Sequence, residues 1–193
     1  MPIASSETTN RALFIEAQNL AKQSRMQVSN SYRVWVTEVA SRAYHDAMST
    51  KDRCDDYLPT VLEEFGCQTG TIHQCRADGA LRLVSQIGVP AGLLEKVTVI
   101  PIGKGIAGAA AERKEPVELC NLQEDLGAFA KPGARETGVS GSIAVPIFSA
   151  ATGEVIGTLG IGKFAPHTFS DDEKSRLFAH AEQIAEWFGH NSG

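Results

Sequence analysis

Two hairpin signals constrain the fold of this chain most strongly. Each consists of two strand-like stretches, rich in β-branched and apolar residues, that are joined by a short turn containing glycine. The four stretches are residues 70–75, 80–87, 142–148 and 154–161. The turns contain Asp78-Gly79 and Thr152-Gly153, which are favoured in tight hairpins. Strands joined by such turns pair antiparallel, so the sequence predicts an antiparallel sheet.

Helical periodicity marks three further segments, in which apolar residues recur at steps of three and four. The segments are residues 28–47, 57–65 and 177–188. Proline is tolerated in the first turn of a helix, so Pro59 predicts that the second helix begins near Asp55 or Asp56. Ser170 and Glu173 have the spacing of a capping box at the start of the last helix.

Composition limits the class of protein. The chain has 193 residues, 42% of them hydrophobic, and a formal net charge of −5 without a basic cluster. This composition suits a soluble globular domain and argues against nucleic acid or a membrane as the main partner. The first residues lack the basic and apolar regions of a signal peptide. Four cysteines without paired spacing fit free thiols, so we expect a cytoplasmic protein.

A segment between the two hairpins, residues 98–110, has the pattern of a strand, a glycine turn and a small helix. Gly103 and Gly105 permit the tight turn, and residues 106–111 are small and apolar, so the helix can lie flat on a sheet. The N–H groups at a helix start lack intrahelical partners and carry partial positive charge. A pocket beneath this segment would therefore suit an anion or a carbonyl oxygen.

Residues 103–108 also match G-x-G-x-x-G, the dinucleotide-binding pattern. That pattern acts in a βαβ unit of a parallel sheet, whereas both hairpins predict antiparallel pairing. A phosphate-binding P-loop is excluded because Lys104 is not followed by serine or threonine. The pattern therefore does not predict a nucleotide cofactor.

Five motifs in order give the chain a resemblance to the GAF domain family over about residues 50–188. They are Gly-Lys-Gly-Ile-Ala-Gly at 103–108, Ile-Ala-Val-Pro at 143–146, Gly-Glu-Val-Ile-Gly-Thr-Leu at 153–159, Phe-Ser-Asp-Asp-Glu at 169–173, and the first helix and hairpin. The resemblance implies an α+β fold: a PAS-like six-stranded antiparallel sheet with terminal helices on one face and a ligand pocket on the other. It divides the chain into a helical lead-in (1–48), a GAF domain (49–189) and a tail (190–193).

GAF domains are mostly ligand sensors in signal transduction and often dimerise through their terminal helices. The resemblance thus implies a bacterial, stand-alone sensor that forms a homodimer through residues 28–47 and 171–188 and acts on a signalling protein such as a sensor kinase. An alternative is an interaction module that binds no ligand and docks on such a protein through its helices. Both hypotheses fit the apolar stripes on the two helices at residues 28–47 and 171–188.

The expected ligand is a small anion such as nitrate, a carboxylate or a nucleotide. The pocket would lie under residues 103–110 and a loop at residues 121–140. Its predicted lining is Leu83, Ile100, Gly105, Ile106, Ala107, Ile143, Val145, Pro146, Lys131 and Arg135. No metal or nucleotide cofactor is indicated, although His167 and other histidines leave haem binding open.

One enzymatic class resembles the chain across the same segment, the free methionine-R-sulfoxide reductases. They need cysteines at positions that alignment of the flanking motifs gives as Val97, Ala107 and about Arg135, and this chain has none there. Cys120 is the only thiol near the expected pocket. One thiol cannot by itself form the intramolecular disulfide that such a reductase needs in its catalytic cycle. Cys67, His73 and Cys75 lack the paired spacings of a zinc site. We therefore expect no enzymatic activity.

Overall fold

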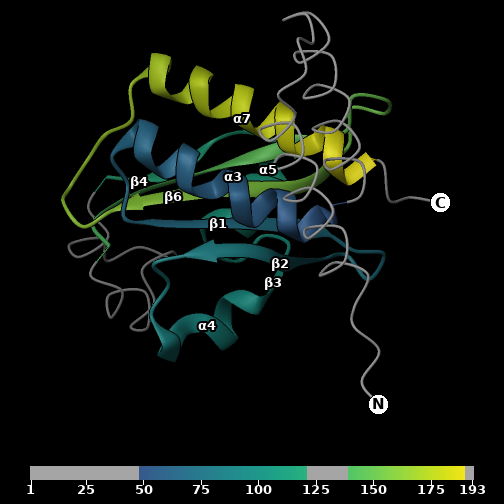
Figure 1. The fold of residues 1–193 in the computed structure, drawn as a ribbon, viewed down its shortest axis with the longest axis horizontal. Coiled ribbons are helices and arrows are strands. Elements are labelled where there is room, and N and C mark those ends of the chain that lie inside the picture. The colour runs from purple at the N-terminus through teal and green to yellow at the C-terminus, as the bar shows by residue number, and fades with distance from the viewer. Residues whose placement is uncertain (1–47, 121–138, 190–193) are drawn as a thin grey trace, which may run out of the picture. The chain divides into compact units, whose positions relative to one another are not determined.

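One antiparallel sheet organises the structure, a computed structural model that describes residues 48–120 and 139–189 (Figure 1). Its strands are β1 (Thr69–Cys75), β2 (Ala80–Ile87), β3 (Val99–Pro101), β4 (Val117–Leu119), β5 (Gly141–Phe148) and β6 (Val155–Lys163). They lie in the order β3-β2-β1-β6-β5-β4, and every neighbouring pair is antiparallel. The six-stranded antiparallel sheet and both hairpins predicted from the sequence are confirmed.

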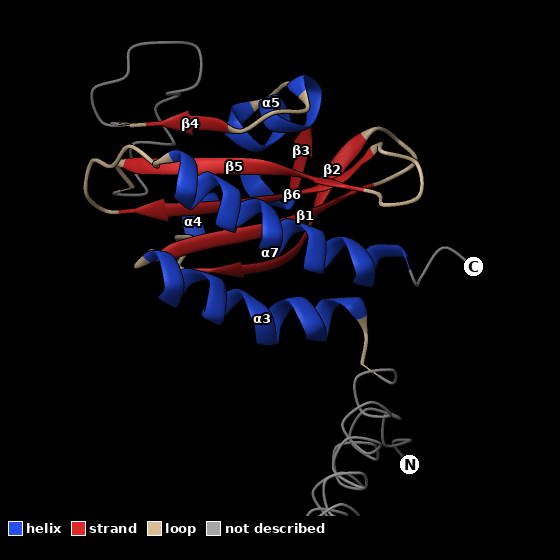
Figure 2. Ribbon diagram, turned by 90° about the horizontal axis from the view of Figure 1, so that it is seen from above, coloured by secondary structure: helices blue, strands red, loops and turns tan. Residues whose placement is uncertain are grey.

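Two long helices cover one face of this sheet. The four described helices are α3 (Thr50–Phe65), α4 (Ala91–Thr98), α5 (Gly105–Arg113) and α7 (Asp171–Gly189). Figure 2 shows α3 and α7 side by side on one face, with α5 on the other. The shorter α4 contacts β2 and β3. The predicted placement of the two long helices on one face is therefore confirmed.

The main hydrophobic core lies between the sheet and the pair α3 and α7. Successive strand residues point to opposite faces, so alternate apolar residues of the central strands face these helices. The buried strand residues are Ile72 of β1, Ile143, Val145 and Ile147 of β5, and Leu159 and Ile161 of β6. They pack on Leu58 and Leu62 of α3 and on Leu177 and Ile184 of α7, among others.

A smaller apolar cluster holds α5 against the opposite face. Ala107 and Ala109–Ala111 of α5 pack on Leu81 and Ala144 of the sheet. The contact is close because α5 carries glycine where it meets β3. A Cβ at Gly108 would lie 2.5 Å from the carbonyl oxygen of Pro101. The small residues of this segment therefore let α5 lie flat on the sheet, as the sequence predicts.

The helix α3 differs from the prediction because it begins at Thr50 and contains Pro59 in its interior. Pro59 is exposed, whereas Cys54 and Leu58 are fully buried on the same apolar stripe as Phe65. Burial of that stripe on both sides of the proline offsets the missing backbone hydrogen bond. The predicted start near Asp55 or Asp56 is wrong for this reason.

The capping box at the start of α7 is confirmed. Ser170 donates its backbone N–H to Oε2 of Glu173 at 2.8 Å, and Glu173 donates its own to Oγ of Ser170 at 3.2 Å.

The predicted helix at 28–47, the loop at 121–138 and the tail lie outside the described residues, so the domain boundaries stay predictions. None of the described helices combines the length and apolarity that crossing a membrane requires.

Replacing Gly108 with alanine should lower the free energy of unfolding by about 1–3 kcal/mol, because the added Cβ forces α5 away from β3. Gly92→Ala is the matched control. Its Cβ would meet open space within α4, so this variant should be as stable as the parent or up to about 1 kcal/mol more stable. Urea denaturation of both variants measures the difference, and equal stabilities would contradict the close approach.

Candidate functional site

The sheet face away from α3 and α7 carries polar side chains on its two central strands. Ile72 and Leu159 belong to the main core, so their strand neighbours His73 and Thr158 point to the opposite face. The two residues are paired across β1 and β6. On the same face, a Cβ at Gly160 would lie 3.1 Å from Oγ1 of Thr71. Small and polar residues therefore replace apolar ones at the centre of this face.

His73 presents a buried hydrogen-bond acceptor on this face. Its side chain is 1% exposed, and its Nε2 lies 2.8 Å from the carbonyl oxygen of Val97. A carbonyl only accepts, so Nε2 carries the proton. Burial lowers the pKa of His73 and keeps the ring neutral, which leaves Nδ1 as an acceptor. No residue in the described part of the chain donates to Nδ1.

Thr158 presents a second buried polar atom beside it. The residue is fully buried, and its Oγ1 has no hydrogen-bond partner among residues 48–120 and 139–189. A buried polar group without a partner costs about 1–3 kcal/mol. Such groups occur where a ligand or an ordered water supplies the missing partner. The pair His73 and Thr158 is therefore a candidate floor for a binding site.

The start of α5 supplies hydrogen-bond donors. Gly105 has a φ of +60°, and the preceding Lys104 is extended and makes no side-chain cap. The first helical hydrogen bond runs from the Gly108 N–H to the Lys104 carbonyl oxygen at 3.0 Å. The N–H groups of Ile106 and Ala107 precede that bond, so they have no acceptor within the helix.

The structure does not bring all the predicted lining residues together. Ile143 and Val145 are fully buried against α3 and α7, because strand alternation turns them away from α5. Pro146 and Ala144 point to the other face, and Pro146 is paired with Thr158 across β5 and β6. The side chain that β5 presents beside the start of α5 is therefore Ala144, which sequence reasoning missed.

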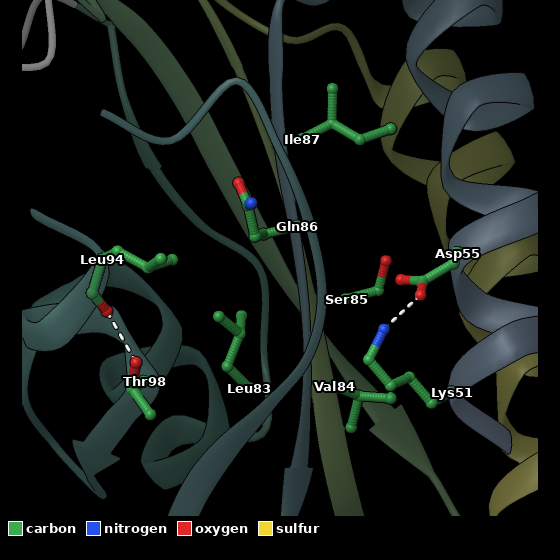
Figure 3. Close-up of a pocket in the computed structure, with 9 residues that line it drawn as sticks. All are labelled: Lys51, Asp55, Leu83, Val84, Ser85, Gln86, Ile87, Leu94 and Thr98. Atoms are coloured by element: carbon green, nitrogen blue, oxygen red, sulfur yellow. Dashed lines mark hydrogen bonds and ion pairs between the residues drawn. The ribbon is translucent and has the colours of Figure 1, made fainter. Parts of the chain in front are cut away.

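The remaining predicted residues fall into three groups. Ile100 and Ile106 pack on the cluster around α5, with Ala107 inside it. Leu83 instead lines a hollow of about 520 Å³ at the edge of β2 (Figure 3). Lys131 and Arg135 lie outside the described residues. From the sequence, His73 is considered only as a metal ligand, and its alternation with Ile72 is the signal that places it on this face.

The thiols in the described part of the chain do not form a reactive pair. Burial raises the pKa of Cys54 to about 12 and that of Cys67 to about 11, so both stay protonated. Cys120 is exposed and follows β4. Within residues 48–120 and 139–189, no three histidine, cysteine or acidic side chains gather as metal ligands would.

Comparison with known proteins identifies the family. A family model described as "GAF domain" matches residues 49–186. No curated protein matches the sequence significantly.

Solved structures resemble the fold. The GAF domain of an Acinetobacter phosphoenolpyruvate-protein phosphotransferase has a TM-score of 0.64 at 20% identity, covering 84% of this chain and 95% of its own. The corresponding domain from Coxiella burnetii has a TM-score of 0.62 at 17% identity, covering 96% of each chain. A type II free methionine-R-sulfoxide reductase from Thermoplasma acidophilum has a TM-score of 0.60 at 17% identity, covering 73% of this chain and 93% of its own. At these identities the likeness shows the fold alone.

His73 should make stability depend on pH below its ordinary pKa of 6.5. Because the folded-state pKa is lowered, the unfolded chain binds a proton there that the folded chain does not, and stability falls as pH falls below that value. His73→Gln keeps a donor for the Val97 carbonyl but cannot titrate. Its melting temperature should therefore fall less than that of the parent between about pH 7.5 and pH 5.5. Parallel melting curves for the two proteins over this range would contradict a neutral, buried His73.

Proposed function

This chain belongs to the GAF domain family, which serves in signalling and ligand sensing, and we propose that it senses a small molecule on the sheet face beneath α5. One observation carries the proposal. His73 Nδ1 and Thr158 Oγ1 are buried on that face, paired across neighbouring strands, and have no partners among the described residues. A bound molecule would supply both partners.

The hydrogen-bonding groups favour a nucleotide among the expected ligands. The Ile106 and Ala107 N–H groups suit an anion, and the N-terminus of α5 adds about 0.3–1 kcal/mol of favourable electrostatics. His73 Nδ1 accepts a hydrogen bond, so it needs an N–H or O–H group of the ligand. A nucleotide carries a phosphate and a base with N–H groups, whereas nitrate and a carboxylate offer only acceptors.

We further propose that sensing involves no turnover. Val97 and Ala107 occupy two of the positions where the reductases of this fold carry cysteine, and neither has a thiol. The Val97 carbonyl instead binds His73, and Ala107 packs on the sheet. Cys120, although exposed, lies beyond β4 and contacts Glu118 rather than another thiol. The family is generally regulatory, which agrees with this proposal.

A second candidate function is that of an interaction module, which would dimerise through its helices. Tyr57 of α3 and Trp187 of α7 lie edge to face with ring centroids 5.1 Å apart, and both are only half-buried. These aromatic rings are available to a partner helix on the surface formed by α3 and α7. A homodimer through residues 28–47 and 171–188 remains compatible with ligand sensing.

Adenosine monophosphate should raise the melting temperature of the protein, since a ligand that binds only the folded state stabilises it. Adenosine and nitrate each offer part of the required chemistry and should raise it less. Thr158→Val should leave the free energy of unfolding of the ligand-free protein unchanged, or raise it by about 1 kcal/mol, because the lost hydroxyl has no partner. The same variant should reduce the shift caused by the nucleotide.

Thr152→Val is the matched control, because it makes the same change in an exposed turn between β5 and β6. It should keep the full nucleotide shift. If none of the three ligands shifts the parent, the sensing proposal fails for these classes. If nitrate shifts the parent as strongly as the nucleotide does, the ligand is a simple anion bound by α5 alone.

Trp35→Glu tests the dimer. Trp35 lies outside the described residues and within the apolar stripe at 28–47. Sedimentation at high micromolar concentration should show a dimer for the parent and a monomer for the folded variant, because a buried charge is costly at an interface. A monomeric parent, or a dimeric folded variant, would refute the predicted interface.

A further inference from the structure

The edge of β2 is open beyond Arg82. β3 pairs only with Ala80–Arg82, and no other strand in the described part of the chain pairs with residues 83–87 on that side. An open edge presents main-chain N–H and C=O groups that can pair with another strand. Proteins often protect such edges with charged residues, proline or β-bulges. Residues 83–87, Leu-Val-Ser-Gln-Ile, contain no charge and no proline, and the register shift between β1 and β2 falls at Val84, which leaves residues 85–87 regular. This edge is therefore competent to accept a further strand.

A shallow hollow of about 520 Å³ runs along this open edge. α3 contributes Lys51 and Asp55 to its lining, and α4 contributes Leu94 and Thr98. Figure 3 shows these two pairs of residues on opposite sides of β2. The hollow therefore follows the edge between two helices rather than covering one face of the sheet. We call it the edge slot.

A buried hydroxyl in the edge slot lacks a partner. Ser85 is 4% exposed and lines the slot on the side of α3. Its Oγ has no hydrogen-bond partner among the residues that the structure describes. It is a buried polar atom without a partner, like those of His73 and Thr158, and it lies on β2 rather than on β1 or β6. An occupant of the slot would satisfy it.

The remaining lining indicates the chemistry of the occupant. Lys51 pairs with Asp55, and the other lining residues are uncharged, so the slot carries no net charge. Leu83, Ile87 and Leu94 add apolar surface. A matching ligand has no net charge, alternates hydrogen-bond donors with acceptors, and carries aliphatic groups. An extended peptide has these three properties.

We propose that the edge slot binds a short, extended peptide with aliphatic side chains, which adds as a further strand to β2. Its main chain would pair with the open edge, and its side chains would point alternately toward α3 and α4. Residues 85–87, beyond the register shift at Val84, span about 10 Å at about 3.3 Å per residue, the length of three peptide residues. The edge slot is lined by β2, α3 and α4, whereas the proposed sensing residues His73 and Thr158 are on β1 and β6, and Leu83 of the slot is paired with His73. Neither proposal requires the other.

The tripeptide Leu-Ala-Leu is a suitable probe, because its first and third side chains point to the same side of a strand. Its N-methylated form, with both peptide N–H groups replaced, has the same charge and nearly the same shape but cannot donate a peptide N–H to the edge. Isothermal titration of the full chain should show saturable binding of the tripeptide. The N-methylated form should bind about three- to tenfold more weakly, since only one of the two peptide N–H groups can face β2 and that hydrogen bond is lost.

Three variants locate the binding. Ser85→Ala should weaken binding about three- to tenfold, through the loss of one hydrogen bond. Leu94→Glu should abolish it by placing a charge in the apolar wall. Phe164→Glu is the matched control, because Phe164 is exposed, as Leu94 is (53% and 36%), but does not line the slot. Melting curves establish that each variant is folded.

Three results would each overturn the proposal. The first is the absence of saturable binding at millimolar peptide. The second is equal affinity for the tripeptide and its N-methylated form, which would indicate apolar adhesion. The third is concentration-dependent protection of amides 83–87 from hydrogen exchange without peptide, which would assign the slot to a second copy of this chain.

Discussion

The period-two alternation of side chains along β1, β5 and β6 is the constraint on which the rest of this structure depends. It sends Ile72, Val145 and Leu159 to one face, where α3 and α7 cover them, and it sends His73 and Thr158 to the other. Burial of the apolar face holds the sheet together. The opposite face is thereby free to carry small and polar residues, which are poor core residues and useful ligand contacts.

On the face opposite α3 and α7, small residues let a helix approach the sheet backbone closely, in place of large apolar side chains. Alanines and Gly108 let α5 lie directly on β3, β4 and β5, so the N–H groups at its start are brought close to the sheet. α4 fixes His73 through the Val97 carbonyl, which sets the ring tautomer and leaves Nδ1 as an acceptor. The N–H donors at the start of α5 and the acceptor Nδ1 of His73 are thus on the same face of the sheet. Each results from a different local interaction.

The sequence predicted the elements of this fold better than it predicted the site. Glycine turns, the apolar stripes of helices and the capping box at Ser170 depend on residues that are close in the sequence. They can therefore be predicted from the sequence. The predicted start of α3 is wrong because burial of Cys54 and Leu58 in the core outweighs the local effect of Pro59. The sequence predicts Ile143 and Val145 in the pocket, whereas they face α3 and α7. The face that a strand residue occupies depends on strand register, which long-range packing decides.

The central claim is that a ligand binds through His73 and Thr158 on the sheet face that also carries α5. A crystal structure of the protein with bound adenosine monophosphate tests it most directly. The account predicts that a ligand N–H or O–H lies within hydrogen-bonding distance of His73 Nδ1, that a ligand polar atom contacts Thr158 Oγ1, and that the phosphate faces the start of α5. A nucleotide bound elsewhere, with both atoms contacted by protein groups, would contradict it.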